Sequence, residues 1–111
     1  MKLPAKYDFK CYRGQTWYQI LRFRQDEEPM DLTGYTAKAQ IRKENNSPIL
    51  VAEMDTDVLE VEGNVVLALP SERTAKLKPG IYVYDVKMTD ANDEVQYYMM
   101  GKFIVEGRVT V

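Results

Sequence analysis

The side chains that enzymes most often use for nucleophilic and acid–base chemistry are nearly absent from this sequence. It contains no histidine and a single cysteine, Cys11. A Ser-His-Asp or Cys-His system cannot be assembled without histidine, and zinc lacks its usual ligands. The six glycines are dispersed and form no phosphate-binding loop. We therefore expect no enzymatic activity, no catalytic residue, no metal and no other cofactor.

The lone thiol is expected to be structural. Cys11 alternates with Tyr7 and Phe9 in a stretch with period two, which predicts that it is a small buried apolar residue. A reactive thiol needs an activating base or cation nearby, and the commonest such base is missing.

Two acidic segments supply the clustered oxygen atoms that calcium prefers. Asp55 and Asp57 form the first, and the second comprises Asp90, Asn92, Asp93 and Glu94. Neither segment has a known calcium-loop spacing, and the same residue types form solvated hairpin turns, which is the interpretation we favour. Asp85 interrupts an apolar strand, where we expect a surface charge that either discourages wrong strand pairing or pairs with a neighbouring Lys or Arg.

Length and charge exclude several classes of protein. The chain has 111 residues, enough for one domain spanning residues 1–111. Its formal net charge is −2 and its Lys and Arg residues are scattered, so we expect neither nucleic acid nor membrane as a partner. No apolar run approaches the ~20 residues that span a bilayer. The first residues lack the apolar core of a secretory signal, which predicts synthesis in the cytoplasm.

Apolar residues recur with period two along almost the whole chain, which predicts an all-β fold. The expected strands lie at residues 6–12, 16–24, 35–42, 49–54, 58–61, 64–69 and in a long hairpin over 80–106. One short helical turn is expected at 71–77, with Ser71 as its N-cap. About seven or eight strands favour an antiparallel β-sandwich, with a small barrel as the alternative.

The helical turn leads into a strand with an early tyrosine, Tyr82, and this order favours an immunoglobulin-like sandwich. In that fold such a tyrosine forms a corner, because its hydroxyl group bonds to the upstream backbone. The paired cysteines of that fold are missing, and Tyr84 stands where the second would be.

The long hairpin carries apolar side chains on both faces. Its last strand is expected to direct Val95, Tyr97, Met99, Phe103 and Val105 into the core. The other face is predicted to carry a partner-docking surface, because contiguous exposed apolar groups usually mark a partner site. Its residues are Ile81, Val83, Tyr98, Met100 and Ile104. Coverage of these side chains by another part of the chain is the alternative.

Three segments, in their order and spacing, resemble a group of small phage and prophage proteins. They are "DLTGY" at 31–35, "TAKLKPGIYVYD" at 74–85, and "YYMMGKFIVEGRVTV" at 97–111. The group includes the N-terminal domain of the phage baseplate upper protein family. The resemblance implies a β-sandwich that attaches to other virion proteins and has no enzymatic activity.

The sequence therefore predicts a phage structural protein of the tail, baseplate, neck or head. Its expected partners are other virion proteins or further copies of itself, so that the protein would enter the virion after its synthesis in the host cytoplasm. The alternative function is a carbohydrate-binding module for host-surface recognition, using exposed tyrosines such as Tyr12, Tyr18 and Tyr98.

Overall fold

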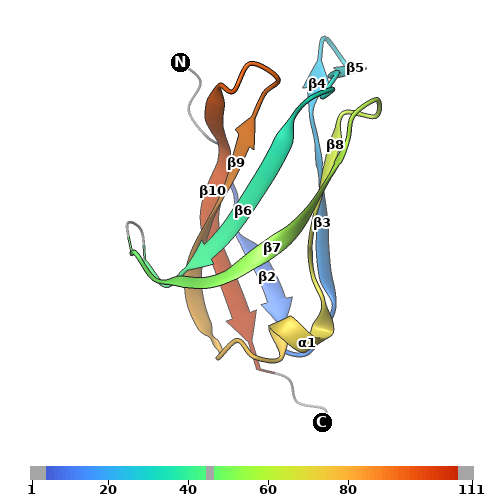
Figure 1. The fold of residues 1–111 in the computed structure, drawn as a ribbon. Helices are drawn as coiled ribbons and strands as arrows, with labels where there is room; N and C mark the ends of the chain where they lie inside the picture. The colour runs from blue at the N-terminus through green and yellow to red at the C-terminus, as the bar shows by residue number, and fades with distance from the viewer. Residues whose placement is uncertain (1–4, 45–46, 108–111) are drawn as a thin grey trace.

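The computed structural model describes residues 5–44 and 47–107, which form ten strands and a single helical turn that lies at one end of the fold (Figure 1). The polar turn expected around residues 45–46 and the end of the resembling segment at 108–111 lie outside the described residues. The strands are β1 (Ala5–Lys6), β2 (Phe9–Tyr12), β3 (Trp17–Arg22), β4 (Arg24–Gln25), β5 (Glu28–Pro29), β6 (Thr36–Arg42), β7 (Leu50–Leu59), β8 (Asn64–Leu69), β9 (Gly80–Thr89) and β10 (Val95–Glu106). The helical turn α1 is Ser71–Thr74.

Eight of the strands form one curled sheet in the order β1-β10-β9-β6-β7-β8-β3, and β2 also pairs with β10. β4 and β5 form a separate two-stranded ribbon. The all-β prediction is confirmed. The layers of the sandwich are two halves of one sheet that folds over on itself, and the immunoglobulin-like topology is not confirmed.

The sheet folds over along β7, where the sequence predicted two strands separated by an acidic turn. The first half of β7 pairs with β6 through Leu50–Met54, and the second half pairs with β8 through Asp55–Leu59. Thr56 lies next to the point where the strand changes partner, and its hydroxyl group donates to the Ala37 carbonyl oxygen at 2.9 Å. The predicted turn at Asp55 and Asp57 is therefore wrong: both are exposed positions of one long strand.

The β9–β10 hairpin contains a bulge that changes which side chains face the core. Tyr97 pairs with Lys87 but Met99 pairs with Val86, so Tyr98 is an extra residue. An extra residue reverses the alternation on either side of it. Met99, Phe103 and Val105 face the core as expected, whereas Val95 and Tyr97 are about half exposed and that part of the prediction is wrong.

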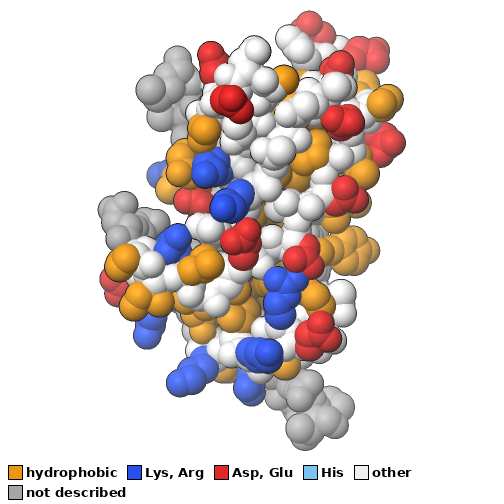
Figure 2. Space-filling model, viewed as in Figure 1, with side chains coloured by type: hydrophobic (Ala, Val, Ile, Leu, Met, Phe, Trp, Pro, Cys, Tyr) orange, Lys and Arg blue, Asp and Glu red, His pale blue; other side chains and the backbone are white. Residues whose placement is uncertain are grey.

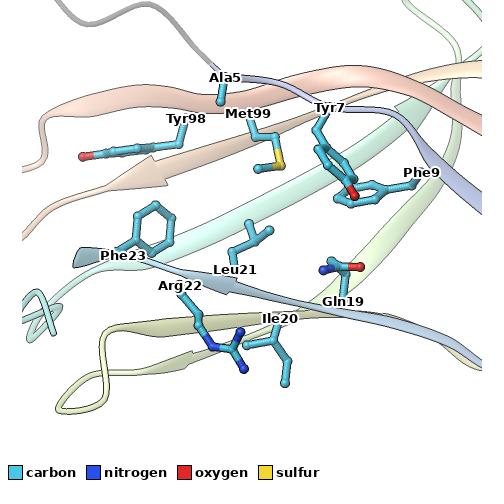
Figure 3. Close-up of a pocket in the computed structure, with 10 residues that line it drawn as sticks. All are labelled: Ala5, Tyr7, Phe9, Gln19, Ile20, Leu21, Arg22, Phe23, Tyr98 and Met99. Atoms are coloured by element: carbon cyan, nitrogen blue, oxygen red, sulfur yellow. The ribbon is translucent and has the colours of Figure 1, made fainter. Parts of the chain in front are cut away.

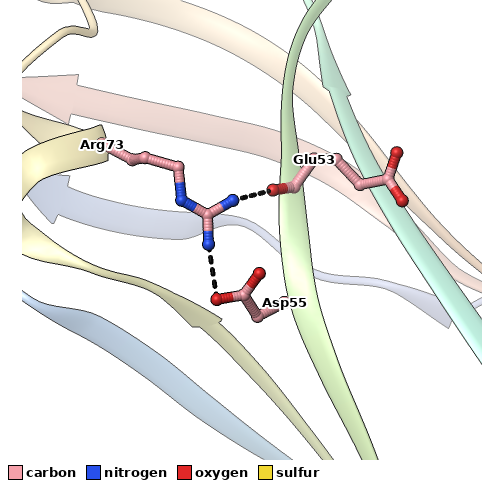
Figure 4. Close-up of polar contacts among 3 residues, drawn as sticks. All are labelled: Glu53, Asp55 and Arg73. Carbon is pink, nitrogen blue, oxygen red and sulfur yellow. Dashed lines mark hydrogen bonds and ion pairs between the residues drawn. The ribbon is translucent and has the colours of Figure 1, made fainter.

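The helical turn is shorter than the predicted 71–77, and Ser71 is its first residue instead of its N-cap, which is Pro70. Arg73 fastens the turn to β7 (Figure 4). Its guanidinium group donates to the Glu53 carbonyl oxygen at 2.8 Å and forms an ion pair with Asp55. Asp55, one of the candidate calcium ligands, therefore pairs with a cationic side chain of the protein, Arg73.

The core lies between the two halves of the sheet and consists of apolar side chains from almost every long strand. Its most deeply buried members are Phe103, Leu32, Ile41, Leu67, Leu69, Met88, Val65 and Val86. Cys11 is also buried, as predicted. On the face shown in Figure 2, acidic side chains gather toward the end that carries β4 and β5, and basic side chains are more frequent near α1. No helix in the described ranges has the length and apolarity needed to cross a membrane.

Candidate ligand-binding cleft

A cleft of about 380 Å³ opens between β3, at one end of the curled sheet, and the N-terminal strands at the other end (Figure 3). We call it the seam cleft. Most of its lining side chains are aromatic or aliphatic. The residues that line it are Ala5, Tyr7, Phe9, Gln19, Ile20, Leu21, Arg22, Phe23, Tyr98 and Met99. The volume and the mainly apolar lining with a few polar groups are typical of ligand pockets.

One wall of the seam cleft is β3. Alternation along this strand directs Trp17, Gln19, Leu21 and Phe23 toward the interior. Leu21 is buried and Phe23 is half-buried, and Gln19 is also only half-buried although its neighbour across the ladder, Leu67, is fully buried. Gln19 lines the cleft, where the two halves of the sheet separate. A polar residue in a core-facing position was the signal in the sequence that could have indicated the cleft.

The opposite wall is the segment from Ala5 to Phe9, which runs parallel to β10 and leaves regular pairing between β1 and β2. The close approach at this interruption requires Gly101, since a Cβ atom there would overlap the Tyr7 carbonyl oxygen. Asp8 holds the interruption in place by accepting a hydrogen bond from the Lys102 backbone N–H at 2.9 Å. Tyr7 and Phe9 then stand side by side, with ring centroids 5.2 Å apart.

Tyr84 ties this wall to β9. Its hydroxyl group donates to the Tyr7 carbonyl oxygen at 2.6 Å, and its ring packs on Phe9 with a centroid separation of 4.8 Å. Burial, with a smaller contribution from Asp8, raises the pKa of Tyr84 well above its ordinary value. The hydroxyl group therefore stays protonated and acts as a permanent hydrogen-bond donor.

The seam cleft is closed at the end where β2 turns into β3. Trp17 packs between Phe9 and Phe103, with centroids 5.3 and 5.1 Å away. Thr74 of α1 holds the turn, because its hydroxyl oxygen accepts from the Gly14 N–H at 3.1 Å and lies 2.8 Å from the Gln15 carbonyl oxygen. Packing and hydrogen bonds thus join the two walls of the cleft at this end. Toward the opposite end of the cleft the two walls separate.

Tyr98 and Phe23 stand at the open end, with ring centroids 5.3 Å apart in an edge-on arrangement. The bulge directs Tyr98 inward, where burial raises the pKa of its hydroxyl group. The prediction that Tyr98 belongs to an outer docking surface is therefore wrong, because a one-residue insertion had reversed the alternation. Tyr98 is a lining residue of the seam cleft.

The other residues predicted for docking do share the outer face of the hairpin. Ile81 pairs directly with Ile104, and Val83 and Met100 lie on the same face. Lys102 and Asp85 alternate with them across the two strands. Burial raises the pKa of Asp85, and the charges of Arg42 and Lys87 offset part of that rise. Docking by this outer face stays a prediction. It now concerns four apolar residues, between which the charged side chains of Lys102 and Asp85 lie.

The remaining sequence predictions concern turns and tyrosines. Asp90 accepts the backbone N–H groups of Asn92 and Glu94 at 2.8 and 2.9 Å, which confirms the interpretation of this segment as a turn. Tyr82 makes the hydrogen bond expected of it, to the Lys78 carbonyl oxygen at 2.6 Å. Tyr12 and Tyr18 are exposed, also as expected. Within the described ranges, no three Asp, Glu, Cys or His side chains are placed to hold a metal ion.

Comparisons with known proteins give little beyond the fold. No family model and no curated protein matches the chain. Among solved structures, CopC from Methylosinus trichosporium OB3b aligns over 99% of this chain and 90% of its own, with 14% identity and a TM-score of 0.48. At this level of similarity the match assigns no ligand or activity to the present protein.

The prediction of a phage virion structural protein is corrected at this point. A solved structure that matches is a CopC and not a virion protein, and neither a family model nor a curated protein supports a virion role. The carbohydrate-binding alternative assumed the same phage setting and is not retained. The resemblance to the baseplate upper protein family and the expected self-association are not tested by these comparisons.

Proposed function

We propose that this protein is a non-enzymatic binding module and that the seam cleft is its ligand site. The observation that carries the proposal is the cleft itself: about 380 Å³ of mainly apolar space between two ends of one sheet. A concave apolar cleft of this size with a few polar groups is typical of ligand sites, and a bound apolar group would cover its lining.

The lining favours a ligand that is apolar in its body and polar at one edge. Tyr7, Phe23 and Tyr98 present ring faces and edges, which give contact area at low entropic cost. Met99 adapts its shape to different ligands. Gln19 supplies an amide group that can both donate and accept a hydrogen bond, and it orients a polar edge of the ligand.

The absence of catalytic groups from the cleft supports a role in binding alone. Among the residues that line it, Arg22 carries the only ionised side chain at neutral pH, and an arginine cannot serve as a general base. The half-buried carboxyl group of Asp85 lies on the outer face of the sheet, away from the cleft. Nothing in the lining activates a nucleophile or transfers a proton.

The test uses the dye 1-anilinonaphthalene-8-sulfonate, whose fluorescence rises when it enters an apolar site. We expect saturable binding to the folded protein, and a loss of at least about tenfold in affinity when Gln19→Trp fills the cleft. Tyr18→Trp is the matched control, because the adjacent residue is 65% exposed on the other side of β3. Melting curves establish that both variants are folded.

Two results would contradict the proposal. One is no saturable dye binding by the folded protein. The other is equal affinity in Gln19→Trp and Tyr18→Trp, which would locate the dye elsewhere.

A further inference from the structure

The wall of the seam cleft formed by β3 presents backbone groups as well as side chains. Five consecutive residues of the chain, 19–23, line the cleft. Successive side chains of a strand point to opposite faces, so a space that touches every residue in a row must lie along the edge of the strand. The edge of β3, and not only its inner face, is therefore open to the cleft.

The hydrogen-bonding pattern shows which groups lie on that edge. Among the strands that the structure describes, β3 pairs only with β8, and the Phe23 N–H donates to the Gly63 carbonyl oxygen on the β8 side at 2.8 Å. In an antiparallel ladder, alternate residues direct both backbone groups to the same neighbour. The N–H and C=O groups of Tyr18, Ile20 and Arg22 therefore point away from β8, toward the cleft.

These backbone groups have no protein partner among the described residues. The hydrogen bonds outside the strand pairs include none from the backbone of Tyr18, Ile20 or Arg22. The strands on the far side of the cleft pair with β10, not with β3. A row of unpaired donors and acceptors beside an apolar groove has the chemistry that recognises an extended peptide.

We propose that the ligand of the seam cleft is an extended polypeptide segment of another protein, which adds to the free edge of β3 as a new strand. This inference depends on the proposed function and specifies its ligand class. Every second side chain of the segment is apolar and enters the cleft beside Leu21, Phe23 and Met99. The remaining side chains face outward and are polar.

Charge indicates one preference of the added strand. Arg22 is exposed next to the free edge, and within the described residues it takes part in neither of the two ion pairs. Opposite charges stabilise directly facing positions of neighbouring strands. We therefore expect the segment to carry an acidic residue at the outward position that faces Arg22.

A second copy of this chain fits the cleft less well than a single extended segment. The segment Ala5–Phe9 stands opposite β3, and the two walls join at the β2–β3 turn. A folded copy would have to bring a whole sheet edge into a space with walls on both sides. One isolated strand needs only about 5 Å beside β3.

The experiment measures binding of a fluorescein-labelled peptide, Lys-Val-Thr-Val-Glu-Val-Thr-Lys, with two N-methylated forms of it. One form carries methyl groups on the valine nitrogens and the other on the threonine and glutamate nitrogens. An added strand directs only one of these two sets toward β3. We expect one form to bind like the parent peptide and the other to lose at least about tenfold in affinity.

Variants of β3 test the same edge from the side of the protein. Ile20→Pro removes an N–H group that faces the cleft while leaving the bonds to β8 in place, a position at which an edge strand tolerates proline. We expect about a tenfold loss of peptide affinity, equal to the lost hydrogen bond. Ile20→Ala also truncates the side chain but keeps the N–H group, so it is the reference relative to which this loss is measured, and melting curves check that both variants fold.

The outcomes separate this inference from the proposed function. Dye binding that Gln19→Trp abolishes, without any peptide binding, would retain the cleft as a ligand site and overturn strand addition. Equal loss, or no loss, with both methylated peptides would also overturn it. A dimer in light scattering that Ile20→Pro dissociates would identify a second copy as the occupant and overturn the assignment to another protein.

Discussion

Residues 97–100 of β10 present the same two side-chain types, tyrosine and methionine, to opposite faces of the sheet. Tyr97 and Met100 lie on the outer face, opposite Lys87 and Asp85. Tyr98 and Met99 lie inside and line the seam cleft. Composition is thus identical on the two faces, and only the bulge decides which pair lines the cleft and which lies on the outer face. Apolar residue types alone do not identify a binding surface.

The two faces also differ in how they are supported. The inner face is bounded by a wall that hydrogen bonds and aromatic packing fix in place, through Tyr84 and Gly101. On the outer face, apolar side chains alternate with charged ones along an open sheet. A fixed concave site loses less conformational entropy on binding than an open surface does, so the inner face is the better binding site.

The largest effect is expected from Gly101→Ala. The new methyl group would overlap the Tyr7 carbonyl oxygen and displace the N-terminal wall of the cleft. We expect the free energy of unfolding to fall by about 3 kcal/mol. Gly107→Ala is the matched control, because a Cβ atom there would lie 3.7 Å from Pro79 in ordinary contact. Equal denaturant midpoints for the two variants would show that the wall does not depend on this close approach.

A smaller loss is expected from Tyr84→Phe. The variant keeps the ring but leaves the Tyr7 carbonyl oxygen without its donor, which should cost about 1–3 kcal/mol. Tyr82→Phe removes a hydrogen bond of the same length at an exposed site, where water replaces the hydroxyl group, and should cost no more than about 0.5 kcal/mol. Thermal melting compares them. A larger loss for Tyr82→Phe would mean that the corner, and not the cleft wall, stabilises this end of the fold.

Neighbouring methionines provide a direct test of the two faces. Met99→Lys places a charge among the apolar lining of the cleft and should destabilise the fold by about 1–3 kcal/mol. Met100→Lys places the same charge opposite Asp85 and should change stability by less than about 0.5 kcal/mol. Urea unfolding of both variants checks the difference. The reverse order would mean that the outer face is the one covered in the folded protein.

The smallest effect is expected from Asp85→Asn, and it depends on pH. Burial holds the pKa of Asp85 above its ordinary value, so the folded state binds a proton more readily than the unfolded state. Stability from this group is present at low pH and is lost as pH rises through the folded-state pKa. The variant lacks this loss, so its urea midpoint should rise relative to that of the wild type as the pH increases from below the ordinary aspartate pKa of about 3.9 to neutrality. Asp57→Asn, at an exposed position of β7, is the control. A constant difference across the range would show that solvent, and not burial, sets the pKa of Asp85.

Much of the fold could be predicted from the sequence because strand alternation is a local property. The inward positions of β3 and β6, the turn at Asp90 and the hydrogen bond of Tyr82 follow from residue types at short spacing. The sequence did not predict that two of the expected strands form the single strand β7. Aspartate is a residue type typical of turns, but pairing with neighbouring strands places Asp55 and Asp57 within a strand.

The sequence by itself determined that the chain is all-β and that its longest hairpin has apolar groups on both faces. Only the tertiary structure decided which of those groups are enclosed. The bulge at Tyr98 depends on the register of two paired strands, and the seam cleft exists because the two ends of one curled sheet meet without pairing. Both are relations between residues far apart in the chain, and the local pattern of side chains gives only one sign of them, the polar Gln19 at an inward position of β3.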